Sequence, residues 1–266
     1  MKKFIVLIFS VAIFACSQNP ITGRKQLMLV SDTQMDSMGV QEYHQFLSEN
    51  RSKVQGNGTD AAMVKRVGSR IAEAVNAYMT QKGFADKMKG YNWEFNLIND
   101  SMVNAWCMPG GKVVVYSALL PITKTEAGLA VVLSHEISHA VACHGNERMS
   151  AQMVQQLGFS ALDAALSSKP EQTRNIFEGA IGMGTQLGVM LPFSRKQESE
   201  ADQMGLIFMA MAGYDPNEAL AFWQRMAAQS QGAPPEFLSD HPSDQTRIND
   251  IKTKYLPEAL KYYKKL

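Results

Sequence analysis

The chain has 266 residues, of which 45% are hydrophobic and 19% are charged, with 19 glycines and 10 prolines. This composition excludes collagen, low-complexity disorder and a disulfide-rich miniprotein, and the length is sufficient for a domain with a substantial core. The formal net charge of +1 indicates neither a basic protein that binds nucleic acid nor an acidic solvating tail, so we expect no nucleic-acid partner.

The first fifteen residues have the pattern of a secretory signal peptide. Two lysines precede an apolar run that ends at Phe14, and the small Ala15 stands before Cys16. The run is shorter than the roughly 20 residues that a transmembrane helix needs. Residues 13–16 resemble the bacterial lipobox, in which the cysteine is acylated and becomes the new N-terminus. A simple signal peptide with an incidental cysteine is the alternative.

These features predict three parts of the chain and a location. We expect residues 1–15 to be a lipoprotein signal peptide, residues 16–31 a lipidated tether and residues 32–266 a single domain, because no repeat, charge block or proline-rich linker divides the rest. Lipid on Cys16 would hold the protein on a membrane of the bacterial cell envelope, facing the periplasm. The absence of aspartate after this cysteine favours the outer membrane.

The predicted elements are mainly helical, with a small β-sheet in the first half. Apolar spacing predicts amphipathic helices at 32–50 and 60–82. Short alternating or β-branched segments predict strands at 91–98, 102–107 and 112–116. From about residue 124 the pattern is helical almost to the end, and the apolar, glycine-rich segment at 179–191 is expected to be a packed helix and not a membrane hairpin. The predicted fold class is α+β.

The decisive motif is His135-Glu136-Ile137-Ser138-His139. Thr123 and Glu126 have the spacing of a capping box, which predicts that a helix begins there. On such a helix the two histidines lie one turn apart on the same face and can share a metal ion, while Glu136 can reach a water molecule on that metal. The alternative is a helix with two surface histidines, but the surrounding apolar run indicates burial, and buried imidazoles need partners.

A catalytic zinc ion usually has three protein ligands and one water, so a third ligand is expected from another helix. The best candidate is Glu198, which precedes an apolar helical stretch together with Glu200 and Asp202. Glu198 and Asp202 lie one turn apart on one face of a helix, whereas Glu200 points elsewhere.

H-E-x-x-H followed by E-x-x-A-D resembles metallopeptidase family 48, which includes the HtpX-type proteases, the prenyl-protein endopeptidases and the mitochondrial Oma-type protease. Further matches extend over essentially the whole chain after Cys16 and are most like bacterial lipoprotein and periplasmic members of the LoiP and BepA type. They are residues 19–30, Asn104-Ala105, Pro109-Gly110-Gly111, His144 with Glu147-Arg148, and His241-Pro242 with Arg247.

The resemblance implies a gluzincin-type zinc peptidase domain, with the H-E-x-x-H helix packed beside a short sheet. By the same resemblance, His135, His139 and Glu198 are expected to bind one zinc ion (Zn2+). Glu136 matches the general base, and Asp202 matches a carboxylate that orients a ligand imidazole. His241 resembles a loop histidine that either blocks the water position or helps the substrate oxyanion, and Arg247 is a second candidate for these roles. His144 is expected to be structural, and Cys143 is not expected to be a ligand.

The implied reaction is hydrolysis of peptide bonds in extended segments, such as those of misfolded or unassembled envelope proteins. We expect such a segment to pair with an edge strand, for which the candidate residues are Asn104, Ala105, Gly110, Gly111, Lys112, Val113 and Val114. The alternative function is a lipid-anchored, chaperone-like binding module with a latent zinc site, in which His241 keeps the water position closed.

Overall fold

The computed structural model describes residues 16–19, 21–166, 191–229, 237–238, 241 and 245–264. The predicted signal peptide at 1–15 and nearly all of the glycine-rich segment at 179–191 lie outside these residues. Among the helices that the structure describes, none is long and apolar enough to cross a membrane.

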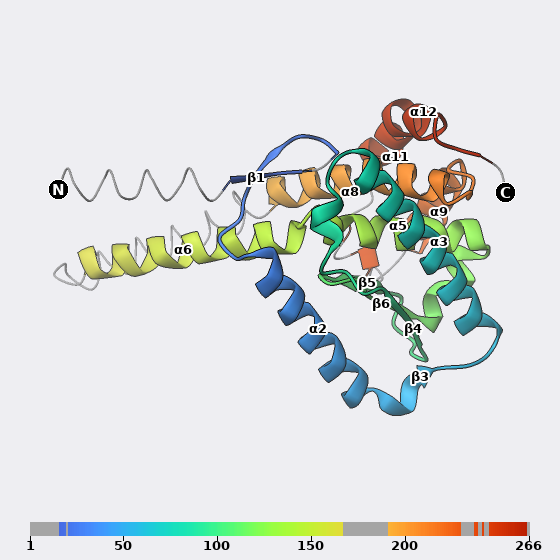
Figure 1. The fold of residues 1–266 in the computed structure, drawn as a ribbon, viewed down its shortest axis with the longest axis horizontal. Coiled ribbons are helices and arrows are strands. Elements are labelled where there is room, and N and C mark those ends of the chain that lie inside the picture. The colour runs from blue at the N-terminus through green and yellow to red at the C-terminus, as the bar shows by residue number, and fades with distance from the viewer. Residues whose placement is uncertain are drawn as a thin grey trace.

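Long helices make up most of the described chain (Figure 1). The first, α2 (Asp32–Glu49), begins with a capping box between Ser31 and Gln34. Both α2 and α3 (Thr59–Gln81) confirm the predicted helices at 32–50 and 60–82. The helices that follow are α4 (Leu120–Thr123), α5 (Glu126–Val141), α6 (His144–Leu166), α8 (Leu191–Met211), α9 (Glu218–Ala228), α11 (Gln245–Asp250), the π-helix η5 (Ile251–Tyr255) and α12 (Leu256–Ala259).

The main sheet has four strands in the order β3-β4-β6-β5. Its strands are β3 (Val54–Gln55), β4 (Glu94–Ile98), β5 (Ala105–Met108) and β6 (Lys112–Tyr116). Strands β4 and β6 are parallel, and β5 runs antiparallel to β6. Two further short strands, β1 (Cys16–Gln18) and β2 (Lys25–Leu27), pair with each other. The three predicted strands are therefore confirmed, and the α+β class with them.

The prediction that residues 112–114 form an exposed edge strand is wrong. Strand β6 lies between β4 and β5, and Lys112, Val113 and Val114 are buried. The Lys112 ammonium donates hydrogen bonds to the backbone carbonyl of Asn92 and to Glu94, which makes its burial possible. Strands β3 and β5 are the two edges of the described sheet, and of these β5 is the strand that pairs with β6.

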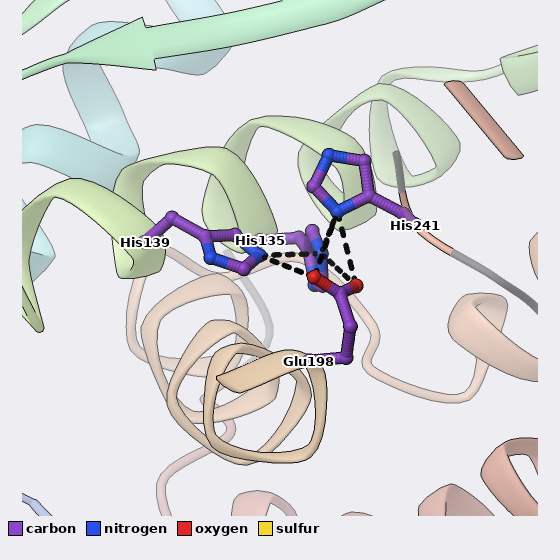
Figure 2. A group of neighbouring side chains, drawn as sticks. All are labelled: His135, His139, Glu198 and His241. Carbon is purple, nitrogen blue, oxygen red and sulfur yellow. Dashed lines mark hydrogen bonds and ion pairs between the residues drawn. The ribbon is translucent and has the colours of Figure 1, made fainter. Parts of the chain in front are cut away.

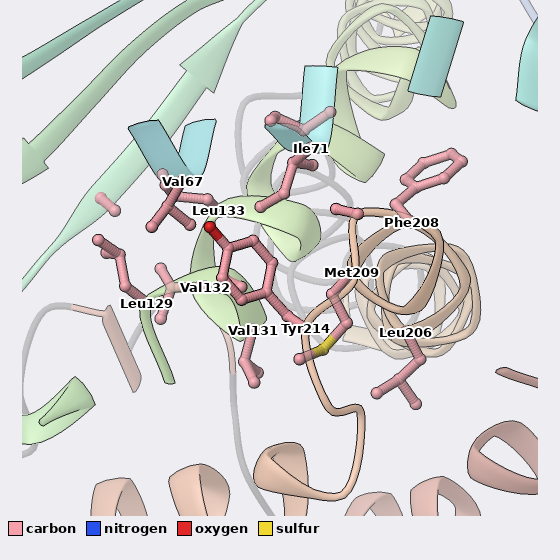
Figure 3. Close-up of a cluster of buried hydrophobic side chains, with 14 of the residues drawn as sticks. Val67, Ile71, Leu129, Val131, Val132, Leu133, Leu206, Phe208, Met209 and Tyr214 are labelled. Atoms are coloured by element: carbon pink, nitrogen blue, oxygen red, sulfur yellow. The ribbon is translucent and has the colours of Figure 1, made fainter. Parts of the chain in front are cut away.

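Helix α5 occupies the centre of the molecule. Every residue from Gly128 to Val141 is buried, as expected for a helix that is apolar on nearly all faces. Apolar side chains of α5, such as Leu133, pack against α3 on one side and α8 on the other, with Ile71 and Phe208 among their neighbours (Figure 3). The histidines of the H-E-x-x-H motif therefore lie on a rigid element.

The start of α5 differs from the prediction. Thr125, and not Thr123, is the N-cap residue, because its hydroxyl accepts a hydrogen bond from the backbone of Gly128 at 3.0 Å. Thr123 instead ends the short helix α4, and Lys124 separates the two helices with a φ of 62°. The predicted capping box between Thr123 and Glu126 is therefore wrong, because the N-cap residue lies two positions later, at Thr125.

Helices α5 and α8 cross in very close contact. A Cβ atom at Gly205 would lie 3.1 Å from the backbone nitrogen of His135, closer than most real Cβ contacts. The glycine therefore allows the two backbones to approach each other. Glu198 lies two turns before this contact on α8, and the close approach brings it to the histidines of α5.

The segment that follows Cys16 packs against the domain. The side chains of Asn19 and Gln26 are buried, and Gln26 donates a hydrogen bond of 2.8 Å to the carbonyl of Ala142 at the end of α5. Asn146 on α6 donates one to the carbonyl of Val30. The residues predicted to form a tether therefore include a stretch that belongs to the folded body.

Candidate metal centre

Four side chains from three parts of the chain meet at the centre of the molecule (Figure 2). His135 and His139 come from successive turns of α5, Glu198 comes from α8, and His241 comes from the segment after α9. One nitrogen or carboxylate oxygen of each lies within 4.8 Å of all the others, and all four residues are buried.

The distances between these atoms suit a tetrahedral metal ion. The Nε2 atoms of His135 and His139 are 3.1 Å apart, and each lies 3.2 Å from a carboxylate oxygen of Glu198. Ligands at the usual zinc distances of about 2.0–2.1 Å would be about 3.3 Å from one another. Two imidazoles and a carboxylate are one of the donor sets of catalytic zinc sites, so the residues present fit this ion.

The electrostatics of the cluster also suit a cation. Burial alone would raise the pKa of Glu198, but the surrounding imidazoles outweigh this effect and lower that pKa far below its usual range. Burial lowers the pKa of His139 well below its usual value, which keeps the imidazole neutral and its lone pair available. An ionised carboxylate and a neutral imidazole are the forms in which these groups bind metals.

Glu136 lies beside the cluster and faces a cavity of about 500 Å³ that it lines together with His139 and His241. Burial raises the pKa of Glu136 to about 7. Its Oε1 atom is 3.3 Å from Nε2 of His241 but makes no hydrogen bond with any described residue. A buried carboxylate oxygen that accepts no hydrogen bond from the described residues and belongs to a residue lining a cavity is suited to accept a proton from a water molecule there.

Asp202 and Arg247 lie on the other side of His135. One Asp202 oxygen is 3.1 Å from Nδ1 of His135, as the sequence analysis expected. Arg247 binds both oxygens of Asp202, at 2.7 and 2.8 Å, and its guanidinium lies 3.6 Å from the ring centre of Trp223. Arg247 also lies 3.3 Å from a carboxylate oxygen of Glu198, so it holds Asp202 and contacts a proposed metal ligand without lining the cavity.

The Arg247 contact with Asp202 supports a prediction about stability. The R247A variant leaves a buried carboxylate without its guanidinium partner, which typically costs about 3–5 kcal/mol. We expect a loss of this size in the free energy of unfolding, measured by urea denaturation. The matched variant is R66A, which breaks an ion pair between exposed side chains of Arg66 and Glu126. A loss in R247A no larger than in R66A would contradict the assignment.

The candidate substrate residues fall into three groups. Asn104 and Ala105, at the start of edge strand β5, line the cavity. Gly110 and Gly111 form the turn after β5 with φ values of 81°, outside the described cavity lining. The third group is the β6 residues Lys112, Val113 and Val114, which lie behind β5 in the sheet.

A second group of buried polar side chains lies behind His139. His144 is fully buried, and its Nδ1 atom lies 2.9 Å from Nδ1 of His139. Glu200, which points away from the metal cluster as predicted, meets the other nitrogen of His144. Arg24, which the sequence analysis did not select, binds Glu200. The sequence could indicate that Glu200 lies near the site, because it is only two residues from Glu198. It could not indicate the partners of Glu200, because they come from distant segments of the chain.

The cysteines do not enter the cluster. Cys107 and Cys143 are free thiols that both line the cavity, and burial raises the pKa of each. A thiol with a raised pKa is a poor metal ligand at neutral pH, in agreement with the expectation for Cys143.

A comparison with protein-family models matches residues 60–255 to peptidase family M48. The chain belongs to peptidase family M48. This match includes the H-E-x-x-H helix, Glu198 and the segment that carries His241, and it confirms the resemblance found in the sequence. Family M48 peptidases use zinc, in agreement with the donor set of the cluster.

Curated M48 relatives include proteins from mitochondria and from bacteria. The mitochondrial metalloendopeptidase OMA1 of Schizosaccharomyces pombe is 36% identical over 244 residues, which cover 90% of this chain and 66% of that protein. The human metalloendopeptidase OMA1 is 28% identical over 250 residues, covering 91% and 46%. The beta-barrel assembly-enhancing protease of Escherichia coli is 31% identical over 169 residues, covering 61% and 34%. The chain thus spans about a third to two thirds of the length of these three relatives.

Proposed function

We propose that this protein is a zinc-dependent endopeptidase that hydrolyses extended segments of other proteins. The observation that carries the proposal is a metal-binding cluster beside the buried Glu136, which lines the same cavity and has one oxygen without a hydrogen bond from the described residues. His135, His139 and Glu198 would hold the zinc ion, and Glu136 would act as the base. The names of the relatives, which include metalloendopeptidases and a protease, support the same activity.

The chemistry follows from the positions of these residues. When bound, zinc supplies a polarised water and a Lewis acid for the substrate carbonyl. The Oε1 atom of Glu136 accepts a proton from the attacking water and delivers it to the amine that leaves. The bond broken is the amide C–N bond, and the products are a carboxylate and an amine. Asp202 fixes the ring of His135 through its Nδ1 atom and thereby its orientation toward the metal.

The edge strand beside the cavity supports an extended substrate. Strand β5 has a free edge within the described sheet, and its first residue, Ala105, lines the cavity with Glu136. A peptide that pairs with β5 would form a fifth strand and carry its backbone carbonyls past Glu136. Such pairing needs an unfolded segment, so misfolded or unassembled proteins are the proposed substrates and quality control is the proposed role.

The position of His241 is the observation that favours the alternative function, a binding module with a latent zinc site. Its Nδ1 atom lies 3.0 and 3.1 Å from the two oxygens of Glu198 and 3.2 Å from Nε2 of His135. It therefore stands where a water molecule would complete the metal site. A site held closed in this way could bind segments without cutting them, which is the chaperone-like alternative.

The H241A variant separates these two functions. If His241 closes an active site, its removal should increase the rate at which casein, an unstructured protein, is cleaved. The increase should be about tenfold if about one molecule in ten of the wild type is open. The rates of wild type and H241A should be compared after each has been loaded with one equivalent of zinc. A decrease in rate with zinc retained would instead show that His241 assists the reaction.

We further propose attachment to a bacterial cell envelope through lipid on Cys16. The basic, apolar and small residues that precede this cysteine support the proposal. Some relatives are named as mitochondrial proteins, so the bacterial location is a proposal and does not follow from the comparisons. Mass spectrometry of the protein purified from membranes tests it. A diacylglyceryl group on Cys16 is the expected result, and an unmodified cysteine in the membrane-bound protein would contradict it.

A further inference from the structure

A chain of buried polar contacts connects the N-terminal segment to one of the proposed zinc ligands. The Nδ1 atom of His139 lies 2.9 Å from Nδ1 of His144, whose Nε2 atom lies 3.2 Å from Oε2 of Glu200. Arg24 then binds Glu200 through two guanidinium nitrogens, each at 2.7 Å. These residues come from α5, α6, α8 and the segment between β1 and β2, so four separate parts of the chain meet in one line of contacts.

The direction of each hydrogen bond in this chain follows from the metal site. His139 faces the cluster with Nε2, so a neutral imidazole that binds zinc there carries its proton on Nδ1. That proton is donated to Nδ1 of His144, which must then carry its own proton on Nε2 and donate it to Glu200. The carboxylate of Glu200 is thus the terminal acceptor, and its orientation determines the orientation of both imidazoles.

Arg24 is well suited to fix this carboxylate. The planar guanidinium binds both oxygens of Glu200, and it also binds both oxygens of Glu147, the second carboxylate of the network. Glu147 and Glu200 are 2% and 6% exposed, so Arg24 is the cation that two buried carboxylates share. The Thr22 hydroxyl donates a further hydrogen bond to Glu200 at 2.8 Å.

We propose that Arg24 is a positioning residue for the metal centre: through Glu200 and His144 it holds the His139 imidazole in the tautomer and orientation that bind zinc. The inference rests on the proposed zinc site. Contacts that orient a ligand imidazole typically contribute 10–100-fold to metal affinity. Thr22 and Arg24, which lie between β1 and β2, would therefore support the metal centre.

The experiment measures zinc affinity in the full chain, by competition with a chromogenic chelator. For R24Q, which removes the charge and the bidentate contact, we expect zinc to bind about 10–100-fold more weakly. R24K, which keeps the charge but lacks the planar fork, should lie between R24Q and the wild type. Saturating zinc should restore most of the cleavage activity of R24Q, because the catalytic groups are unchanged.

Two controls keep a positioning role apart from a general loss of structure. R66Q removes an arginine from an exposed ion pair and should bind zinc as the wild type does. The circular dichroism and melting temperature of zinc-free R24Q show whether it folds. If it does not fold, H144N decides, because asparagine keeps an acceptor near Nδ1 of His139 but cannot reach Glu200. H144N is also expected to bind zinc more weakly.

A folded R24Q whose zinc affinity is within about twofold of the wild type would overturn the inference. So would wild-type affinity in H144N if R24Q does not fold. Failure of the proposed function has a different signature: the wild type itself would then either not bind one equivalent of zinc or bind it without cleaving casein, even as H241A.

Discussion

Replacing Glu136 with glutamine is expected to lower kcat for casein cleavage by about 10²–10⁴-fold while one zinc ion stays bound per chain. The amide has nearly the shape of the carboxylate but cannot accept the proton of the attacking water. The three proposed ligands are not touched, so zinc content measured by mass spectrometry should not change. The experiment therefore separates the base from the metal site.

The matched variant for this prediction is E126Q. Glu126 is the first residue of the same helix, and its side chain forms an exposed ion pair with Arg66. It should keep both zinc and activity. If E136Q retained more than about a tenth of the wild-type kcat, Glu136 would not be the general base and the assignment of the reaction would fail.

Replacing Glu198 with glutamine is expected to abolish activity for another reason, the loss of zinc. Glu198 supplies the carboxylate of the cluster and is 5% exposed. An amide oxygen carries no net charge, so the variant should be purified with much less than one equivalent of metal. Because zinc binds the folded state, its removal should also lower stability, by about 4 kcal/mol at a free zinc concentration 1,000 times the dissociation constant.

Thermal unfolding with and without a chelator tests this effect of Glu198. For a chain of this size, about 4 kcal/mol corresponds to a decrease of roughly 8–16 °C in the melting temperature of the wild type when zinc is removed. The chelator should leave the melting temperature of E198Q nearly unchanged. The control is E73Q, which neutralises an exposed carboxylate on α3 and should respond to the chelator as the wild type does. An equal response in E198Q would show that Glu198 is not a ligand.

Much of this site could be predicted from the sequence because its spacing is local. His135 and His139 share a helix face whenever the segment is helical, and the same holds for Glu198 and Asp202. The apolar run around the histidines predicted that α5 would be buried, and the structure confirms this. Helices α2 and α3 were also recognisable, because their apolar periodicity extends over several turns.

Other features depend on contacts between distant segments and have no local signal. Strand β6 was predicted to be an edge because its two preceding glycines allow close approach, but its pairing with β4 and β5 places it inside the sheet. The order of strands depends on a crossover that no single segment specifies. The contact of Arg24 with Glu200 joins residues 176 positions apart in the chain, so no local spacing in the sequence points to this arginine.

We propose that one zinc ion, held by His135, His139 and Glu198, makes this protein a peptidase. The test is the rate of casein cleavage by zinc-free protein as zinc is added in known amounts. We predict that the rate rises from background and reaches a plateau at one equivalent per chain. One tightly bound equivalent without cleavage, in the wild type and in H241A alike, would contradict the claim.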